Sequence, residues 1–318
     1  MKNVLITGAA GFIGKKLCEF YLIQNWQVYG LDNFCTSDEK SLDFHELKSH
    51  EQFHFERFDI THDWAGLQTK FPRFDFVFHL ASPASVLQYQ NLSLETMWAN
   101  SWGLKNAIAQ ADQCQCRLIF TSTSEIYGSP QVSPQSENYW GHVNSFGERS
   151  CYDESKRFGE ALIYSSNKKN KTRHGVVRIF NTYGPGMLAN DGRVITQFIY
   201  QALKQKDLTL YGDGAQTRCF CYVDDLITGL ARYAETSITE PVNLGNDEEI
   251  TILDLAKNII ELTGSRSQIV FKLLPADDPP QRRPDLGRAR SQLNFENTIS
   301  LRQGLEQMIA SVKTSLTS

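Results

Sequence analysis

The chain begins with a short apolar segment that runs directly into a glycine-rich turn and then into a helical pattern. Residues 4–6 are apolar, glycines follow as Gly8, Gly11 and Gly14, and apolar residues recur at helical spacing from Leu17 onward. Glycine permits a sharp turn and lets a pyrophosphate approach the unpaired N–H groups at a helix N-terminus. The strand, turn and helix therefore predict a dinucleotide-binding unit, although the spacing G-x-x-G-x-x-G departs by one residue from the commoner G-x-G-x-x-G.

An acidic residue ends the second predicted strand. Residues 27–31 form that strand, and Asp32 follows it. A carboxylate there is placed to accept both ribose hydroxyls of the adenosine half, and it would repel a 2′-phosphate, so NAD is favoured over NADP. A turn that only packs a helix on a strand is the alternative interpretation. The order of strand, helix and acidic residue favours the cofactor site.

Strand-like and helical segments alternate through the first half of the chain. Residues 74–81, 116–121 and 176–180 have the composition of buried strands. We predict an α/β fold, in which a doubly wound parallel sheet forms an NAD-binding Rossmann domain over residues 1–180. Shorter elements punctuated by Gly and Pro follow. They predict a smaller α/β substrate-binding domain over residues 181–318, partly interleaved with the first.

A tyrosine and a lysine four residues apart indicate proton chemistry. On a helix, Tyr152 and Lys156 share a face, so the ammonium can lie beneath the ring. An ammonium there favours the phenolate, which makes the tyrosine a usable general base. Taken alone, the pair is more typical of a solvated helix face. Its weight comes from the dinucleotide-binding turn and from Thr123, in the loop that follows the preceding predicted strand.

The composition limits which kinds of partner and which cellular compartment we expect for this protein. The 318 residues carry a net charge of −4, which leaves no basic footprint for nucleic acid. The seven cysteines are an odd number without a Cys-x-x-Cys pair, which favours reduced thiols. No apolar run approaches the length of a membrane span, and the first residues already belong to the nucleotide-binding strand. We expect a cytoplasmic protein that binds neither membrane nor metal.

The motifs resemble the extended short-chain dehydrogenase/reductases that modify nucleotide sugars, and the resemblance runs nearly end to end. It starts from the three glycines, Asp32, Thr123 and Tyr152-x-x-x-Lys156. Within that family the chain is most similar to the group of UDP-glucuronate decarboxylases. The segments that carry this similarity are residues 122–128 (STSEIYG), 139–144 (YWGHVN), 149–154 (RSCYDE), 178–185 (RIFNTYGP), 190–194 (NDGRV), 211–218 (YGDGAQTR), 277–279 (DDP) and 282–285 (RRPD).

The resemblance implies oxidation of the sugar at C4 with NAD, loss of CO₂ and return of the hydride, so that NAD acts catalytically. The catalytic residues it implies are Thr123, Glu125, Tyr152, Lys156 and Arg282. The cofactor-binding residues are Gly8, Gly11, Phe12, Ile13, Gly14, Asp32, Asn33, Asp59, Ile60, Leu80, Ala81, Tyr152 and Lys156. The substrate-binding residues are Pro83, Ser85, Tyr89, Ser124, Glu125, Asn181, Arg193, Tyr211, Gln216, Arg218 and Arg282. The resemblance also suggests a homodimer formed through helices near residues 98–109 and 152–164.

Three hypotheses remain at the level of sequence. The first is a decarboxylase of UDP-glucuronate. The second is a 4-epimerase or 4,6-dehydratase of the same fold; dehydratases carry an acidic residue where this chain has Ser124, because expelling a hydroxyl needs a general acid, and Glu125 counts mildly against an epimerase. The third is a non-catalytic NAD-binding module, which the intact Thr123, Tyr152 and Lys156 do little to support. Gly186 stands where these enzymes usually have arginine, which removes one guanidinium from the substrate side.

Overall fold

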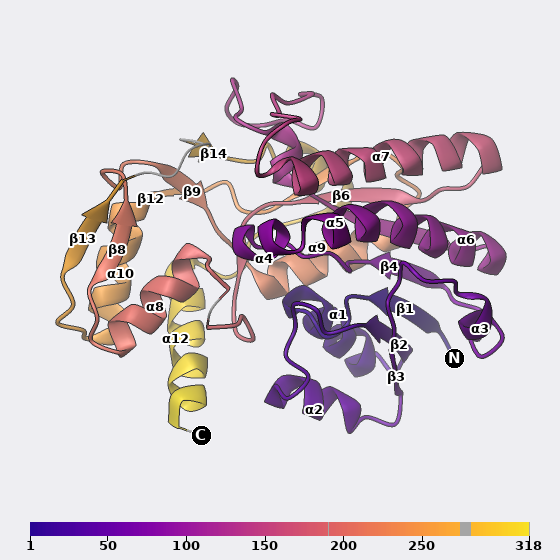
Figure 1. The fold of residues 1–318 in the computed structure, drawn as a ribbon, viewed down its shortest axis with the longest axis horizontal. Helices are drawn as coiled ribbons and strands as arrows, with labels where there is room; N and C mark the ends of the chain where they lie inside the picture. The colour runs from indigo at the N-terminus through magenta and orange to yellow at the C-terminus, as the bar shows by residue number, and fades with distance from the viewer. Residues whose placement is uncertain (190, 274–280, 318) are drawn as a thin grey trace. The chain divides into compact units, whose positions relative to one another are not determined.

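A computed structural model of the chain describes residues 1–189, 191–273 and 281–317 (Figure 1). The chain forms two compact units, each assembled from three segments. The first unit contains residues 1–126, 144–178 and 227–242. The second contains residues 127–143, residues 179–226 and the segment from Asn243 to the C-terminus. The chain therefore passes from one unit to the other several times.

A seven-stranded parallel sheet is built on the first unit, in the order β11-β6-β5-β4-β1-β2-β3. Strands of a parallel sheet are covered on both faces, which explains their continuous apolar runs. Val4, Leu5 and Ile6 of the first strand are fully buried. The α/β class is thereby confirmed. The strands are β1 (Asn3–Thr7), β2 (Gln27–Asp32), β3 (Phe53–Arg57), β4 (Phe76–His79), β5 (Arg117–Thr123), β6 (Gly175–Ile179) and β11 (Val242–Leu244).

Helices cover both faces of this sheet. Helix α1 (Phe12–Ile23) packs on β1 and β2, whereas α6 (Leu104–Cys114) and α7 (Ser150–Asn170) pack on β5. From β1 the chain adds β2 and β3 on one side of the sheet, and β4, β5 and β6 on the other side. Because crossovers between parallel strands are right-handed, α1 lies on one face of the sheet and the α6–α7 pair lies on the other (Figure 1). The other helices that begin in this unit or end in it are α2 (Leu42–Lys48), α3 (Ala65–Gln68), α4 (Val86–Asn91), α5 (Ser93–Trp98), the π-helix η1 (Ala99–Gly103), the 3₁₀-helix η2 (Ser124–Tyr127) and α9 (Val223–Glu235).

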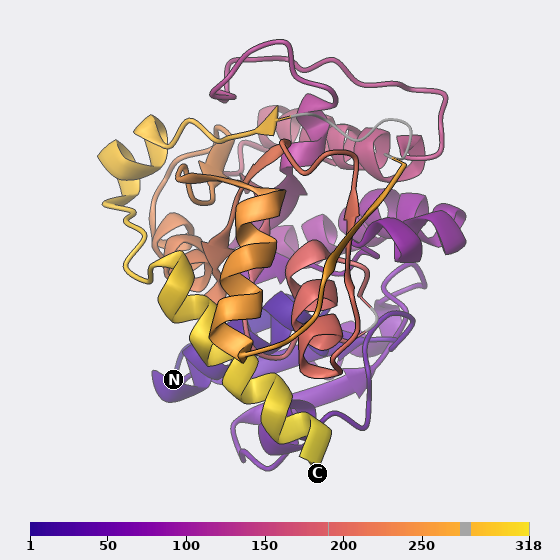
Figure 2. The same ribbon diagram turned by 90° about the vertical axis from the view of Figure 1, so that its left-hand side faces the viewer.

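The second unit combines small sheets with helices, in agreement with the predicted smaller α/β domain. Its helices α8 (Val194–Leu203), α10 (Ile252–Thr263) and α12 (Leu301–Thr317) pack on one another (Figure 2). Helix α11 (Gly287–Leu293) precedes α12. The strands pair as β7 (Thr182–Tyr183) with β10 (Cys221–Tyr222), β8 (Leu208–Tyr211) with β13 (Ile269–Lys272), and β9 (Thr217–Cys219) with β12 (Glu249–Thr251) and β14 (Gln281–Arg282).

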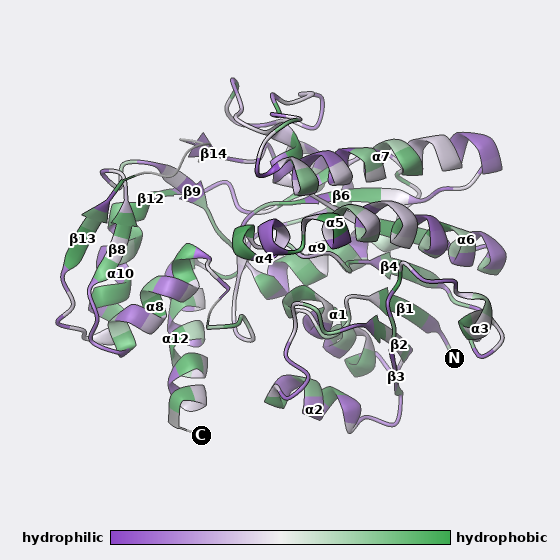
Figure 3. Ribbon diagram, in the orientation of Figure 1, coloured by the Kyte–Doolittle hydropathy of each residue, from purple (hydrophilic) through white to green (hydrophobic). Residues whose placement is uncertain are grey.

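Hydropathy follows the layers of the first unit. Strand β1 lies in the hydrophobic colours of Figure 3, whereas the C-terminal end of α7, which carries Lys168 and Lys169, is hydrophilic. All seven cysteines have free thiols. Within the described ranges, no helix is both long enough and apolar enough to cross a membrane.

Candidate active site

The strand order reverses between β1 and β4, which is where doubly wound sheets bind ligands. Leu80 N donates to Thr7 O at 3.2 Å, and Ala81 N donates to Thr7 Oγ1 at 3.3 Å. Gly8 has a φ of +74°, and a β-carbon on it would lie 2.8 Å from Ala81 N. Glycine at this position therefore lets the two strand ends meet at the predicted cofactor site.

The first turn of α1 is shaped to receive a phosphate group. A β-carbon on Gly14 would lie 1.9 Å from Gly8 O, and one on Gly11 would lie 3.2 Å from the same oxygen. The helix begins at Phe12, and Ile13 is its second residue. Its N-cap residue, Gly11, provides no side-chain hydrogen bond to the first turn. Helix N–H groups left without a side-chain cap are an anion-binding site. The glycine cradle fits the pyrophosphate of NAD.

Asp32 lies at the end of β2 and is almost completely buried. Its carboxylate accepts hydrogen bonds from Ala10 N at 3.0 Å, Phe34 N at 2.8 Å and Ser37 Oγ at 3.1 Å. Burial raises the pKa of Asp32 above its ordinary value, and these donors oppose the shift. A carboxylate has about four lone-pair sites, so capacity remains for a ribose hydroxyl.

The residues that we expect beside the adenine of NAD lie next to Asp32 in the chain or after the following strand, β3. Asn33 Nδ2 donates to Asp59 Oδ2 at 3.2 Å, and Thr61 donates to the other Asp59 oxygen. Burial raises the pKa of Asp59, but these hydrogen bonds outweigh it and the net shift is downward. Ile60 is buried in the hydrophobic core of the first unit. The structure thus brings Asn33 and Asp59 together, and their contact with the adenosine half stays a prediction.

Tyr152 and Lys156 lie on one face of α7. Lys156 Nζ is 5.8 Å from the centroid of the Tyr152 ring and 4.9 Å from that of Phe120. It donates to Thr121 O at 2.7 Å. Burial lowers the pKa of Lys156 to about 7. The lysine is therefore fixed beside the tyrosine and titrates in the neutral range.

Tyr89 of α4 adds an aromatic wall to this cluster. Its ring stacks on that of Tyr152, with centroids 4.9 Å apart and an interplanar angle of 6°. Tyr89 is 1% exposed and Ser85 is 3% exposed, and neither hydroxyl has a hydrogen-bond partner among the described residues. Burial raises the pKa of Tyr89 well above its ordinary value, which keeps this hydroxyl a donor. Pro83, in the same loop, is also buried.

The end of β5 carries the residues expected to act on the sugar. Thr123 and Ser124 are buried. Glu125 N donates to Thr123 Oγ1 at 3.2 Å, within the turn that opens η2. The Glu125 carboxylate forms an ion pair with Arg149, which stands immediately before α7. The ion pair therefore joins the turn after β5 to the start of α7, the helix that carries Tyr152.

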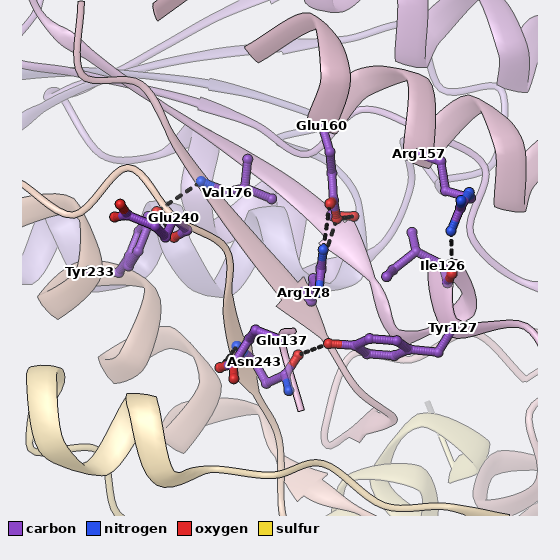
Figure 4. Close-up of polar contacts among 11 residues, drawn as sticks. Ile126, Tyr127, Glu137, Arg157, Glu160, Val176, Arg178, Tyr233, Glu240 and Asn243 are labelled. Carbon is purple, nitrogen blue, oxygen red and sulfur yellow. Dashed lines mark hydrogen bonds and ion pairs between the residues drawn. The ribbon is translucent and has the colours of Figure 1, made fainter. Parts of the chain in front are cut away.

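Two side chains of α7, those of Arg157 and Glu160, contact β5, its turn and β6. Arg157 Nη1 donates to Ile126 O at 3.0 Å (Figure 4). Glu160 forms a bidentate pair with Arg178 of β6 at 3.0 and 2.8 Å, and it accepts from Ser122 Oγ at 2.6 Å. Bidentate pairs fix geometry as well as charge. The pair with Arg178 fixes α7 against β6, and the bond from Ser122 holds the end of β5 against the helix that carries Tyr152.

The predicted nucleotide-binding residues belong to the second unit. Arg193, at the N-cap of α8, pairs with Asp191 at 2.9 Å. Arg218 Nη1 donates to Thr217 O at 2.8 Å on β9. Gln216 Nε2 donates to the main-chain oxygen of the half-exposed Tyr211 at 2.7 Å. These side chains all lie near strand ends or helix ends.

Asn181 and Arg282 are placed by main-chain contacts in this unit. Cys221 N donates to Asn181 O at 2.9 Å, just before β7. Arg282, on β14, is buried, and its Nη2 donates to Gly128 O at 3.4 Å. Gly186 has a φ of +93°, a conformation that favours glycine over the usual arginine. The motif residues 277–279 and residue 190 lie outside the described residues.

Two features of the site escaped the sequence analysis. Arg149 received no role, although its position three residues before Tyr152 was a usable signal. Asn100 lies in the π-helix η1 and donates to Ser82 Oγ and Ser155 Oγ, both at 3.0 Å. A π-helix has no readable sequence signal, so this buried bridge to the helix of Tyr152 could not be predicted. The described residues contain no group of three or more His, Cys, Asp or Glu arranged to hold a metal ion.

The chain is similar in sequence and in fold to known proteins. Residues 4–245 match the model described as the NAD dependent epimerase/dehydratase family. UDP-glucuronic acid decarboxylase 1 of Danio rerio is 43% identical over 308 residues, which cover 97% of this chain and 72% of that protein. The UDP-glucuronic acid 4-epimerase of Bacillus cereus, solved with UDP-glucuronic acid and NAD, has a TM-score of 0.88 and 29% identity, covering 98% of this chain and 99% of the other. The UDP-glucose 4-epimerase of Thermotoga maritima, solved with UDP-glucose, has a TM-score of 0.90 and 25% identity, covering 99% of both chains.

Proposed function

The chain belongs to the NAD dependent epimerase/dehydratase family, and from this premise we propose that it is a decarboxylase that converts UDP-glucuronate to UDP-xylose. NAD is its cofactor. The observation that carries the proposal is the set Thr123, Glu125, Tyr152 and Lys156 gathered around the end of β5. Relatives named UDP-glucuronic acid decarboxylase, 40–43% identical over almost the whole chain, support it.

The first chemical task belongs to Tyr152. When protonated, Lys156 Nζ, 5.8 Å from the centroid of the Tyr152 ring, favours the phenolate that removes the proton from the sugar 4-hydroxyl. When bound, NAD supplies the hydride acceptor at C4 and later returns the hydride. Gly8, Gly11 and Gly14 would hold its pyrophosphate, and Asp32 would hold the adenosine ribose.

Oxidation at C4 makes the next bond labile. The substrate carboxylate is then β to a ketone, so the bond from C5 to the carboxylate breaks, CO₂ leaves, and the electron pair enters an enolate. Hydroxyl donors from Tyr152 and Thr123 stabilise the charge on O4. A proton adds at C5, and reduction at C4 completes the pentose. The net reaction consumes one proton and UDP-glucuronate, and it releases CO₂ and UDP-xylose.

The contacts of Glu125 argue against dehydration. A 4,6-dehydratase needs a general acid to expel the 6-hydroxyl as water. Ser124 is too weakly acidic, and an ion pair with Arg149 favours the charged, proton-accepting form of Glu125. Glu125 instead orients the substrate carboxylate or a water near C5. The 4-epimerase alternative shares the fold and the first step, and it differs in the product.

Each unit carries its own set of proposed binding residues. The sheet unit binds NAD, and Pro83, Ser85, Tyr89 and Ser124 of that unit contact the sugar. The second unit binds the nucleotide: Arg193 and Arg218 suit the diphosphate oxygens, Tyr211 suits the uracil, and Asn181 and Gln216 supply amide hydrogen bonds.

A homodimer and a cytoplasmic location complete the proposal. Trp98 and Trp102 stack on each other at 5.9 Å, and both are exposed on α5 and η1. Phe158 and Tyr164 of α7 are exposed as well, and α5 packs on α7. Exposed aromatic groups on adjoining helices suit a subunit interface. Light scattering of the purified protein tests the dimer.

Free thiols at all seven cysteines suit a reducing compartment, which agrees with the proposed cytoplasmic location.

The reaction is tested by incubating the purified protein with UDP-glucuronate and catalytic NAD⁺, and by following CO₂ and the sugar product by mass spectrometry. UDP-pentose formed without net NADH supports the proposal. UDP-galacturonate would establish the epimerase instead, and a 4-keto-6-deoxy product from a nucleotide hexose would establish a dehydratase. No turnover of UDP-glucuronate would overturn the decarboxylase.

A further inference from the structure

The ion pair between Arg149 and Glu125 lies within the reactive cluster of the first unit. Arg149 stands at the N-cap of α7, and its carbonyl accepts hydrogen bonds from Tyr152 N and Asp153 N, both at 3.1 Å. Its guanidinium reaches 24 residues back along the chain to the Glu125 carboxylate. The side chains are 20% and 16% exposed, so solvent screens this pair only in part.

An unpaired Glu125 would oppose the substrate of the proposed reaction. UDP-glucuronate carries a sugar carboxylate, and the proposed function places this group near Glu125. Two carboxylates held close together in a partly buried site repel each other. A guanidinium bound to Glu125 cancels most of this repulsion and fixes the position of the carboxylate.

We propose that Arg149 is a positioning residue that neutralises and orients Glu125, so that an anionic uronate can bind beside it. This inference rests on the proposed function. The electrostatic surroundings agree: burial lowers the pKa of Arg149, but Glu125, Tyr89 and Asp153 outweigh it and raise the pKa above its ordinary value. Arg149 thus stays cationic next to Tyr89, whose ring stacks on Tyr152.

The test separates charge from architecture by comparing two ligands. Kd values for UDP-glucuronate and for UDP-glucose, which lacks the carboxylate, are measured on the NAD-bound protein in a Tyr152→Phe background, where turnover is blocked. Arg149→Met should raise the Kd for UDP-glucuronate about 30- to 100-fold, which corresponds to roughly 2–3 kcal/mol. It should change the Kd for UDP-glucose less than about threefold. Arg149→Lys, which keeps the charge, should recover most of the loss.

A double variant and a neighbouring arginine complete the design. Glu125→Gln combined with Arg149→Met removes both charges, and it should bind UDP-glucuronate within a few-fold of Glu125→Gln alone. Arg157→Met loosens the same turn through its bond to Ile126 O (Figure 4), and it should leave the ratio of the two Kd values unchanged. If Arg149→Met is poorly folded, Arg149→Gln gives the same comparison with a hydrogen-bonding side chain.

The outcomes distinguish this inference from the decarboxylase proposal. Equal weakening of both ligands by Arg149→Met, no recovery in the double variant, or the same selectivity loss in Arg157→Met would overturn the role of Arg149 even if the enzyme makes UDP-xylose. Conversely, wild-type protein that releases no CO₂ but shows the Arg149-dependent selectivity would overturn the decarboxylase and leave the role of Arg149 standing.

Discussion

The ring of Tyr89 lies flat against the ring of Tyr152, with centroids 4.9 Å apart and planes inclined by 6°. The Tyr89 hydroxyl is buried without a partner among the described residues. A buried polar group that lacks a partner is costly unless a ligand satisfies it. The stacked pair therefore joins the proposed general base to a donor that is available to the sugar.

Replacing Tyr89 with Phe should raise KM for UDP-glucuronate about three- to tenfold, since one neutral hydrogen bond contributes roughly 0.5–1.5 kcal/mol. Stability without substrate should be unchanged or slightly higher, because no hydrogen bond within the described part of the chain is lost. Urea unfolding and steady-state kinetics measure the two effects.

Tyr233 provides the matched control for this substitution. Its hydroxyl accepts from Val176 N at 2.9 Å and donates to Glu240 O at 3.0 Å (Figure 4). Tyr233→Phe should lower the free energy of unfolding by about 1–3 kcal/mol and leave KM alone. The reverse pattern in the two variants would contradict a ligand-facing role for Tyr89.

Tyr152→Phe should lower kcat about 10²- to 10⁴-fold, because the phenolic oxygen that carries the proton is removed. The ring that stacks on Tyr89 is retained in this variant, so NAD affinity should stay near wild type. Single-turnover absorbance at the nicotinamide band should show no NADH. Rapid NADH formation in this variant would assign the proton to another group.

Lys156 should make stability depend on pH in a direction opposite to that of a salt-bridged lysine. Its pKa is 10.5 in the unfolded chain and about 7 in the folded protein. Between these values the unfolded state binds a proton that the folded state has released, so the free energy of unfolding rises with pH. Below about pH 7 the lysine is charged in both states, and the burial penalty is fully present.

The measurement compares wild type with Lys156→Met, both freed of NAD, by urea unfolding between pH 6 and pH 10. The stability of wild type relative to the variant should rise from about pH 7 upward, with a slope of at most about 1.4 kcal/mol per pH unit. Parallel curves for the two proteins would show that Lys156 keeps an ordinary pKa.

Gly14→Ala should abolish NAD binding and destabilise the first unit by several kcal/mol. The added β-carbon would lie 1.9 Å from Gly8 O, a backbone atom that cannot move without opening the turn. Gly66→Ala is the control, because nothing lies within 4 Å of its β-carbon on α3. That change should be neutral or stabilising by up to about 1 kcal/mol. Thermal unfolding with and without NAD measures both, and normal NAD binding by Gly14→Ala would rule out the proposed cradle.

Local patterns in the chain were sufficient to predict the sheet class, the glycine turn, Asp32 at the end of β2, and Tyr152 with Lys156 on one helix face. Each depends on residues close together in the sequence, where helical and strand periodicity fix geometry. The similarity of motifs also pointed to the second unit for nucleotide binding. A partly interleaved second domain was predicted as well, but without the bounds of its segments, because unit boundaries depend on which distant elements pack together.

What the sequence determined by itself was therefore the type of chemistry: a dinucleotide turn, a proposed base with its lysine, and a carboxylate one residue beyond Ser124. Tertiary structure decided which groups surround that chemistry. Arg149 meets Glu125 across 24 residues, and Lys156 meets Thr121 across 35. Such contacts arise from the way α7 packs on β5, and side-chain spacing within either element carries no information about that packing.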